Sequence, residues 1–248
     1  MTWLLPLASR MAPFLLVTCV VWVIVIVVFM VSLWLRIRSY HRTPYFADTR
    51  TSFWAVRRDT GAYGEYQTYV HLRKLPGQKR FLFNCYVPKD DSTTTEIDVI
   101  MLHGSGIYVF ESKNYSGWIF GNESQRSWTQ TFPSGRKEHF YNPLMQNTTH
   151  ITWLARLFPA LPPDVYHSII VFSERCTVKK LVMTSGYHQV VQRNHVLGAV
   201  TPTLHHTVLT DETIEEIYTT LYPLTQVSDD VRQAHITSIH DSEKHYFS

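Results

Sequence analysis

Apolar residues divide the chain into an uncharged first segment and a longer part built of short mixed patterns. Residues 12–35 contain no Asp, Glu, Lys or Arg and are rich in Val, Leu, Ile and Trp. A helix of this length spans roughly 36 Å, at about 1.5 Å per residue, and a hydrocarbon core measures about 30 Å. A secretory signal is the alternative, but its apolar region is usually only about 7–15 residues long. The pattern predicts a transmembrane helix over residues 12–35, preceded by a short segment 1–11.

Helical spacing recurs at three places in the rest of the chain. Apolar residues at intervals of three and four predict a helix over residues 62–75, which Pro76 closes. Asn142 followed by a proline predicts a helix that runs to residue 158. Thr210 before an aspartate predicts another helix, which ends near residue 221. Residues after 228 are polar and partly helical in pattern.

Strand patterns fill the interval between these helices. Short or alternating apolar runs predict strands over 80–87, 96–103, 107–113, 118–120, 128–132, 137–141, 167–172 and 189–192. The order of helix, strands, helix, strand and helix predicts a mixed α/β domain. The arginine-rich residues 36–58 are expected to form an irregular juxtamembrane linker. The domain is expected to cover residues 59–175, and residues 176–248 form a C-terminal extension, either a cap on the sheet, a partner surface or both.

Charges on the two sides of the apolar segment predict its orientation. Arg10 alone precedes it, whereas Arg36, Arg38, Arg42 and Arg50 follow it. The positive-inside rule then places the N-terminus outside and the following domain in the cytoplasm, at the cytoplasmic membrane if the protein is bacterial.

The net charge of +3 comes from the same arginines. Residues 1–50 hold five Arg and one acid, whereas residues 51–248 hold 18 Lys and Arg against 19 Asp and Glu. The domain therefore has no bulk basic character, and any nucleic-acid binding requires a local patch. Cys19, Cys85 and Cys176 show no spacing typical of a disulfide framework or a zinc site.

The segment IDVIMLHGSGIYVFESKN, residues 97–114, holds the strongest candidate chemistry. Its centre, His-Gly-Ser-Gly, follows a strand pattern, as the oxyanion loop of an esterase does. That class also needs a nucleophile in a Gly-x-Ser-x-Gly turn, and none follows Gly106. The preferred interpretation is a two-residue hairpin turn at Gly104 and Ser105.

A two-residue turn fixes the register of the two flanking strands. It places Asp98 opposite Glu111, with Lys113 on the same face as Glu111. Two facing acids destabilise a sheet unless a cation compensates them, and carboxylate oxygens are the ligands that Mg²⁺ and Mn²⁺ prefer. A solvated hairpin face is the alternative. Against it, the charges share their faces with apolar residues: Ile100 and Leu102 with Asp98, and Ile107 and Val109 with Glu111. Glu65 also lies on or beside the apolar face of the first helix of the domain.

Three segments together resemble one known family, the nuclease-related domain (NERD) family. They are GAYGEYQTYVHLRKL, TEIDVIMLHGSGIYVFESKNYSGWIFG and YNPLMQNTTHI. The resemblance runs from about residue 61 to residue 172, and the family is similar to the restriction-endonuclease-like PD-(D/E)xK nucleases. It implies a mixed sheet flanked by helices. Val99 stands where the family often has His, which is a mild departure.

The resemblance also assigns roles to residues. Asp98 and Glu111 would hold Mg²⁺ or Mn²⁺, with Glu65 contributing through water. Lys113 would position the attacking water or stabilise the transition state. Gln146 would orient either the scissile phosphate or Lys113, and its alternative is a helix-surface amide.

Asn142, Pro143, Gln146 and Asn147 form the later motif of the family. For Asn142, a helix N-cap is as good an interpretation as a site residue.

The sequence thus predicts a membrane-anchored, metal-dependent nuclease that hydrolyses phosphodiester bonds, in DNA in the first instance. The alternative is a membrane-tethered module that binds nucleic acid or a protein without cutting. The near-neutral domain favours the alternative, since backbone binding usually needs several basic contacts. The complete set of Asp98, Glu111 and Lys113 favours the enzyme.

Overall fold

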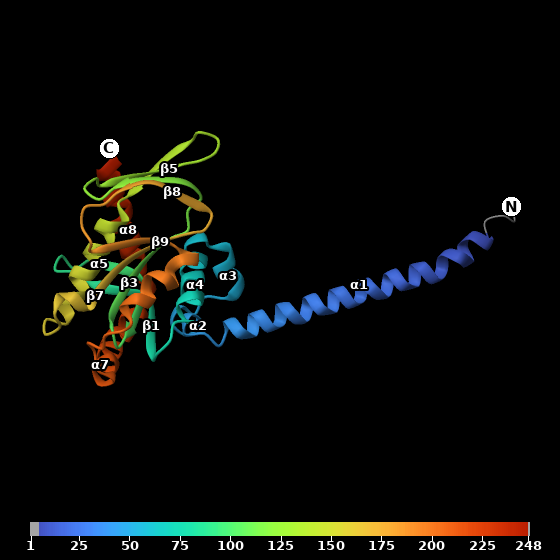
Figure 1. Ribbon diagram of the computed structural model, residues 1–248, viewed down its shortest axis with the longest axis horizontal. Coiled ribbons are helices and arrows are strands. Elements are labelled where there is room, and N and C mark those ends of the chain that lie inside the picture. Colours follow the sequence, from blue (N-terminus) through green and yellow to red (C-terminus); the bar gives the residue numbers. More distant parts are fainter. Residues whose placement is uncertain (1–4, 248) are drawn as a thin grey trace.

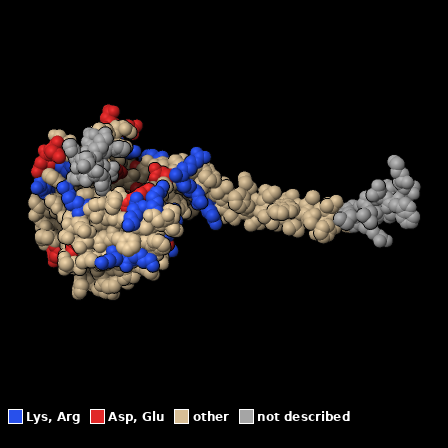
Figure 2. Space-filling view, turned by 90° about the horizontal axis from the view of Figure 1, so that it is seen from above, with Lys and Arg blue, Asp and Glu red and all other residues tan. Residues whose placement is uncertain are grey.

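The first helix, α1 (Leu5–Tyr40), projects away from a folded domain that contains the described residues after it (Figure 1). The computed structural model describes residues 5–247, with side chains from residue 13 to residue 239. Residues Pro13–Tyr40 are long and apolar enough to cross a membrane, with a mean hydropathy of 3.3 in a window that the protein does not bury. Figure 2 shows the described surface of α1 as uncharged until basic side chains appear near the domain. The expected helix over 12–35 is therefore a candidate membrane span.

The segment expected as an irregular linker is folded, and that expectation was wrong. The end of α1 is followed by α2 (Pro44–Thr49) and α3 (Phe53–Arg58). Helices this short are unstable alone, and tertiary packing stabilises them. The fully buried ring of Tyr40 provides this packing. It contacts aromatic rings of α2, α3 and α4, those of Tyr45, Phe46, Phe53 and Tyr66.

A five-stranded mixed sheet forms the centre of the domain. Its order is β1 (Lys79–Pro88), β2 (Thr94–His103), β3 (Gly106–Lys113), β7 (Tyr166–Phe172) and β9 (His188–Gln192). The first three strands are antiparallel and the last three parallel.

The β2–β3 hairpin closes through the turn that the sequence predicts. His103 pairs with Gly106, which leaves Gly104 and Ser105 as a two-residue turn. Gly106 has a φ of 143°, and a Cβ there would meet the Val165 carbonyl oxygen at 2.5 Å. A residue without a side chain is therefore required where the hairpin meets the segment that leads into β7.

Helices cover both faces of this sheet. On one face, α4 (Thr60–Leu72) and α6 (Val196–Val200) join α2 and α3 over the apolar side chains of Val99, Tyr108 and Phe110. On the other face, α5 (Pro143–Leu157) and α7 (Asp211–Leu221) cover a second apolar layer that includes Ile100, Ile107 and Val109. Short 3-10 turns lie at Pro163–Val165, Arg193–His195, Thr201–Thr203 and Tyr222–Thr225.

A second mixed sheet lies beside the end of the first, at the top of Figure 1. Its order is β6 (Lys137–Tyr141), β5 (Ser127–Thr131), β4 (Gly117–Asn122) and β8 (Cys176–Val182). Trp128 is fully buried here and stacks on Phe172 of the first sheet, which joins the two sheets.

Residues after 175 contribute to both sheets. Strand β8 pairs with β4, and β9 pairs with β7. Helix α8 (Asp229–Phe247) follows and lies against the start of β2 through His235. The expected C-terminal extension is thus continuous with the domain. The chain has the predicted mixed α/β fold, with sheets flanked by helices.

Candidate active site

The C-terminal end of β3 presents its side chains alternately to α5 and to α4. Lys113 Nζ donates to Gln146 Oε1 of α5 at 3.0 Å. The intervening Ser112 faces the opposite way, where its hydroxyl lies 3.2 Å from that of Thr68 in α4. This period-two alternation of a strand places Glu111 and Lys113 together on the α5 face.

Glu111 is buried between two partners. Its carboxylate is 1% exposed, and Oε1 accepts from Lys113 Nζ at 2.6 Å. Nε2 of His150 lies 3.0 Å from Oε2. Burial alone would raise the pKa of Glu111, but Lys113 and His150 together hold it below its usual value. Burial would likewise lower the pKa of Lys113, and the Glu111 charge raises it instead. The pair is therefore ionised.

His150 is a site residue that the sequence reasoning missed. It lies one helical turn after Gln146 in α5 and is 3% exposed. With its proton on Nε2, the ring donates to Glu111, and Nδ1 accepts from the Thr95 hydroxyl at 2.6 Å. The spacing of four residues from Gln146 was a usable signal, because residues i and i+4 share a helix face.

Asp98 is the next residue beyond the paired part of the β2–β3 hairpin. The observed pairs run from His103–Gly106 to Val99–Phe110, and the same register continued by one step would place Asp98 opposite Glu111. Its Oδ2 accepts from the backbone N–H of Ser112 at 2.8 Å. Burial, and then the negative charges of Glu111 and Glu65, raise the pKa of Asp98 well above its usual value.

Glu65 approaches from the other side of the sheet, in α4. Its Oε2 lies 3.3 Å from the Tyr45 hydroxyl. Burial, and then the charge of Glu96, raise the pKa of Glu65 to about 8. Gly64 permits this close approach, because a Cβ at that position would lie 2.8 Å from the Cβ of Asn114. The negative charge of Glu65 thus acts on Asp98 from the α4 side, while Glu111 faces α5.

Two residues of the later motif have structural partners. Asn142 is the N-cap of α5, accepting from Leu144 N at 2.9 Å, while its amide nitrogen donates to carbonyls of the β4–β5 connection. The amide nitrogen of Asn147 donates to Val109 O and Ser168 Oγ and joins α5 to the sheet. The capping interpretation of Asn142 is the one that the structure shows.

A cavity of about 400 Å³ opens beside the Lys113 side of this cluster. Its lining includes Glu96, Lys113, Gln146 and His150, with His235 from α8. The Glu96 carboxylate lies 3.7 Å from His235 Nε2, and burial raises the pKa of Glu96. The sequence reasoning did not single out Glu96, although it lies only two residues before Asp98.

The acidic cluster fits a divalent cation held by few protein ligands. Among the described residues, no three His, Cys, Asp or Glu side chains are arranged together as a metal-binding group. Mg²⁺, however, is usually bound through one or two carboxylates, with water and substrate phosphates completing its shell. Burial, and then neighbouring negative charges, raise the pKa values of Asp98 and Glu65, so a cation beside these acids would favour their ionised forms. Asp98 and Glu111 are therefore a suitable pair of ligands.

Ser105, the nucleophile of the esterase interpretation, is closed off. It is 5% exposed, and its hydroxyl lies 2.8 Å from His103 Nδ1 and 2.7 Å from Tyr108 Oη. His103 Nδ1 also accepts from the backbone N–H of Ser105, so these contacts stabilise the turn.

The fold and the cluster define a class of protein. A mixed sheet that ends in an acid on one strand and a Glu-x-Lys element on the next is the arrangement of the restriction-endonuclease-like, PD-(D/E)xK-type domains.

Comparisons with known proteins give the family. Residues 60–173 match the nuclease-related domain, and the chain belongs to this NERD family. It is also 30% identical over 182 residues to an uncharacterized protein of Bacillus anthracis, an alignment that covers 73% of this chain and 84% of that protein. No solved structure matches the chain significantly.

Proposed function

We propose that this protein is a membrane-anchored nuclease that uses Mg²⁺ or Mn²⁺ to hydrolyse phosphodiester bonds of DNA. One observation carries the proposal. The buried, ionised Glu111–Lys113 pair lies level with a second carboxylate, Asp98, at the end of a sheet that borders an open cavity. A structural ion pair alone would not require a second, uncompensated acid beside it.

Each residue of the cluster has a role in this reaction. Asp98 and Glu111 would hold the metal ion, with Glu65 placed to contribute through water. Lys113 supplies positive charge to the phosphate oxygens as negative charge develops there. Gln146 and His150 hold Lys113 and Glu111 in position. The metal ion, when bound, neutralises phosphate charge and lowers the pKa of the attacking water.

A non-catalytic module, tethered to the membrane and binding nucleic acid or protein, is the second candidate. Both oxygens of Glu111 already have partners, and the described residues contain no group of three metal ligands. Residues 51–248 are also nearly neutral. These observations favour binding without cleavage, and a cleavage assay separates the two candidates.

The membrane arrangement is part of the proposal. The excess of arginines after the apolar segment supports an orientation with the N-terminus outside and the domain in the cytoplasm. The last turns of α1 pack on the domain through Leu33, Ile37 and Tyr40, and with α1 in a membrane this packing would hold the domain near the membrane surface.

Plasmid cleavage by the full chain in lipid nanodiscs tests the function. We expect nicking with Mg²⁺ or Mn²⁺, none with EDTA, and strong loss in Asp98→Ala and Lys113→Ala. Lys74→Ala is the matched control, since Lys74 is exposed at the end of α4. Nicking that persists in both site variants would overturn the site. Salt-dependent binding without cleavage would establish the non-cutting module, and an RNA substrate tests the choice of DNA.

A further inference from the structure

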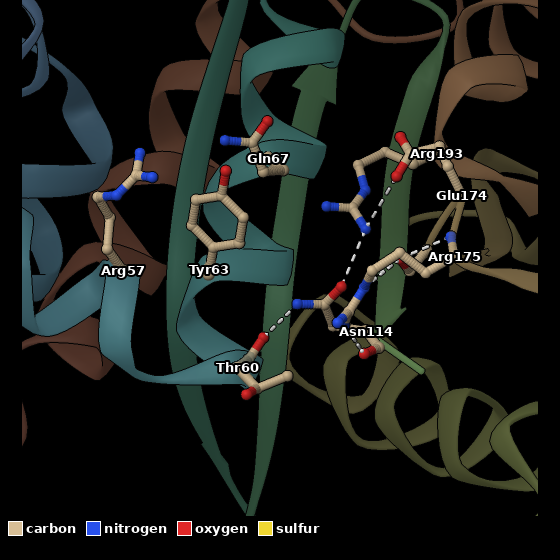
Figure 3. A pocket seen from close by; sticks show the side chains of 9 residues that line it. Arg57, Thr60, Tyr63, Gln67, Asn114, Glu174, Arg175 and Arg193 are labelled. Carbon is tan, nitrogen blue, oxygen red and sulfur yellow. Dashed lines mark hydrogen bonds and ion pairs between the residues drawn. The ribbon is translucent and has the colours of Figure 1, made fainter. Parts of the chain in front are cut away.

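A second cavity flanks the end of β3, on the α4 side. It has a volume of about 310 Å³ and is lined by three arginines, Arg57 of α3, Arg175 and Arg193, which we call the arginine pocket. Figure 3 shows these arginines around Tyr63, Gln67 and Asn114. Glu174 is the acidic residue in the lining. Positive charge therefore exceeds negative charge in this cavity.

Arg193 is the strongest sign that the pocket binds a ligand. It is only 3% exposed, yet its buried Nε has no hydrogen-bond partner. Its Nη2 donates to Asn114 Oδ1 at 3.2 Å and lies 3.4 Å from a Glu174 oxygen. In Figure 3 its guanidinium reaches from the side of Glu174 toward Gln67 of α4. A buried guanidinium whose charge has one distant carboxylate partner is costly, and an anion in the pocket that this residue lines would compensate that charge.

The other two arginines are exposed and lack acidic partners. Arg57 lies over the rings of Phe53 and Tyr63, with each ring centre 5.7 Å from its guanidinium carbon. Arg175 donates to the Asn114 carbonyl at 2.6 Å and to Ser173 Oγ. No salt bridge joins either arginine to an acid within the described part of the chain. Their guanidinium groups are therefore available to an anionic ligand.

Asn114 places this pocket next to the candidate active site. It directly follows Lys113, and its side chain bridges Arg193 to the carbonyl of Thr60 in α4. Because successive side chains of a strand point to opposite faces, Lys113 borders one cavity and Asn114 the other. A polynucleotide whose scissile phosphate meets Lys113 would thus carry a neighbouring phosphate toward the arginines.

We propose that the arginine pocket binds a backbone phosphate of the polynucleotide, adjacent to the phosphate that is cut. This inference rests on the proposed function, since it assumes a nucleic-acid substrate. Planar guanidinium groups match the oxygens of a phosphate, and several of them around one cavity suit this ligand better than a single carboxylate. The pocket also supplies the local basic patch that the nearly neutral domain requires.

Binding measured without metal tests the pocket separately from cleavage. The full chain in nanodiscs is titrated, in EDTA, into a fluorescent single-stranded oligonucleotide of about 12 nucleotides at several salt concentrations. The double variant Arg57→Gln/Arg175→Gln removes two exposed guanidinium groups and leaves the buried Arg193 in place. Arg80→Gln is the matched control, because Arg80 is exposed, pairs with Glu215 and lies at the opposite end of the sheet.

We expect the double variant to bind about tenfold more weakly, with a salt slope smaller by about 0.7 for each phosphate that the variant no longer neutralises. Arg80→Gln should bind as the wild type does. Unchanged affinity and salt slope in the double variant would overturn the proposal. Oligonucleotides with and without a 5′-phosphate locate the contact: equal weakening supports a backbone phosphate, and weakening confined to the phosphorylated one overturns it in favour of a terminal phosphate.

The outcomes distinguish this inference from the proposed function. Pocket-dependent binding without any metal-dependent cleavage would leave the backbone-phosphate contact standing and remove the nuclease activity. Metal-dependent cleavage together with unchanged oligonucleotide binding in the double variant would support the nuclease activity and overturn the role of the arginine pocket. Weaker oligonucleotide binding by Arg193→Lys, with an unchanged melting temperature, would further support phosphate binding in the arginine pocket. Lysine keeps the positive charge but lacks the planar geometry of the guanidinium.

Discussion

The two faces of the sheet at the end of β3 differ in how their charges are compensated. On the α5 face, Glu111 has a hydrogen-bonding partner for each oxygen, and Lys113 is held between Glu111 and Gln146. On the α4 face, the guanidinium of Arg193 is buried with an unpaired nitrogen. The charges of the first face are compensated within the protein, whereas the second face keeps a buried donor without a partner. Asp98 lies at the strand edge between them, with its pKa raised by burial and by acids on both sides.

The largest effect is expected from a neutral amide on the α5 face. Glu111→Gln should reduce metal-dependent cleavage by about 10²–10³-fold, comparable to the loss of one preorganised electrostatic group. The amide keeps an oxygen for Lys113, so the fold should persist. Single-turnover cleavage measures the rate, and circular dichroism confirms the fold. A folded variant with wild-type cleavage would remove Glu111 from the mechanism.

Removing the cation of the same face should destabilise the domain. Lys113→Met leaves Glu111 buried with His150 alone, and breaking a buried ion pair from one side costs about 3 kcal/mol. Urea unfolding of the full chain measures this loss, with the exposed Lys74→Met as control. An equal stability of the two variants would mean that Lys113 does not compensate Glu111.

The acids nearer α4 should make stability fall as pH rises. The pKa of Glu65 is about 8 in the folded chain against 4.5 without the protein environment, so the unfolded chain loses this proton first. Stability should therefore decrease between these two pH values and then level off, with Asp98 acting in the same direction. Glu65→Gln should make the melting temperature less dependent on pH across this range. An unchanged pH profile in that variant would contradict the burial of an acid there.

Mg²⁺ should reverse this pH effect, because a cation favours ionised carboxylates. At 100 times its dissociation constant, a ligand stabilises the folded state by about 2.7 kcal/mol. We expect a larger Mg²⁺-induced rise in melting temperature at pH 8 than at pH 5.5, in wild type but not in Asp98→Asn. A rise that is equal in both proteins would place the bound metal elsewhere.

The smallest effect is expected on the α4 face. Arg57→Gln should change the free energy of unfolding by no more than about 0.5 kcal/mol, since Arg57 is exposed and has no ion pair within the described residues. The same urea experiment measures it. A loss of several kcal/mol would indicate that Arg57 has a structural role, and would contradict the view that its guanidinium is available to a ligand.

Local patterns of the sequence were sufficient for the hairpin and its flanking helices. The two-residue turn predicted the register observed from His103–Gly106 to Val99–Phe110, and Asn142 before Pro143 predicted the start of α5. These features depend on residues close in sequence, where turn chemistry and capping decide the structure.

Other features depend on contacts that no local pattern encodes. Strand β8 carries exposed lysines, and α2 and α3 are stabilised by rings from distant helices. Asn84 has a φ of 50° within β1. In the neighbouring strand β2, Ile97 packs in the core on the α5 side, whereas Val99, two residues further on, packs in the core on the α4 side. The period-two rule therefore fails beside Asp98.

The arginine pocket could not be predicted for the same reason. Arg175 and Arg193 follow β7 and β9, which are neighbours in the sheet, and Arg57 joins them from α3, which packs beside α4. His150 differs, because its spacing from Gln146 was visible in the sequence. Its burial against Glu111 became evident only once α5 was packed on β3.

The rate of single-turnover DNA cleavage at increasing Mn²⁺ concentration tests the central claim most directly. The full chain in nanodiscs should show a rate that rises with Mn²⁺ and saturates. Asp98→Asn should cleave at least about 10²-fold more slowly, while binding the same oligonucleotide in EDTA. A rate that is independent of metal, or equal in the two proteins, would contradict the assignment of the β3 end as a metal-dependent nuclease site.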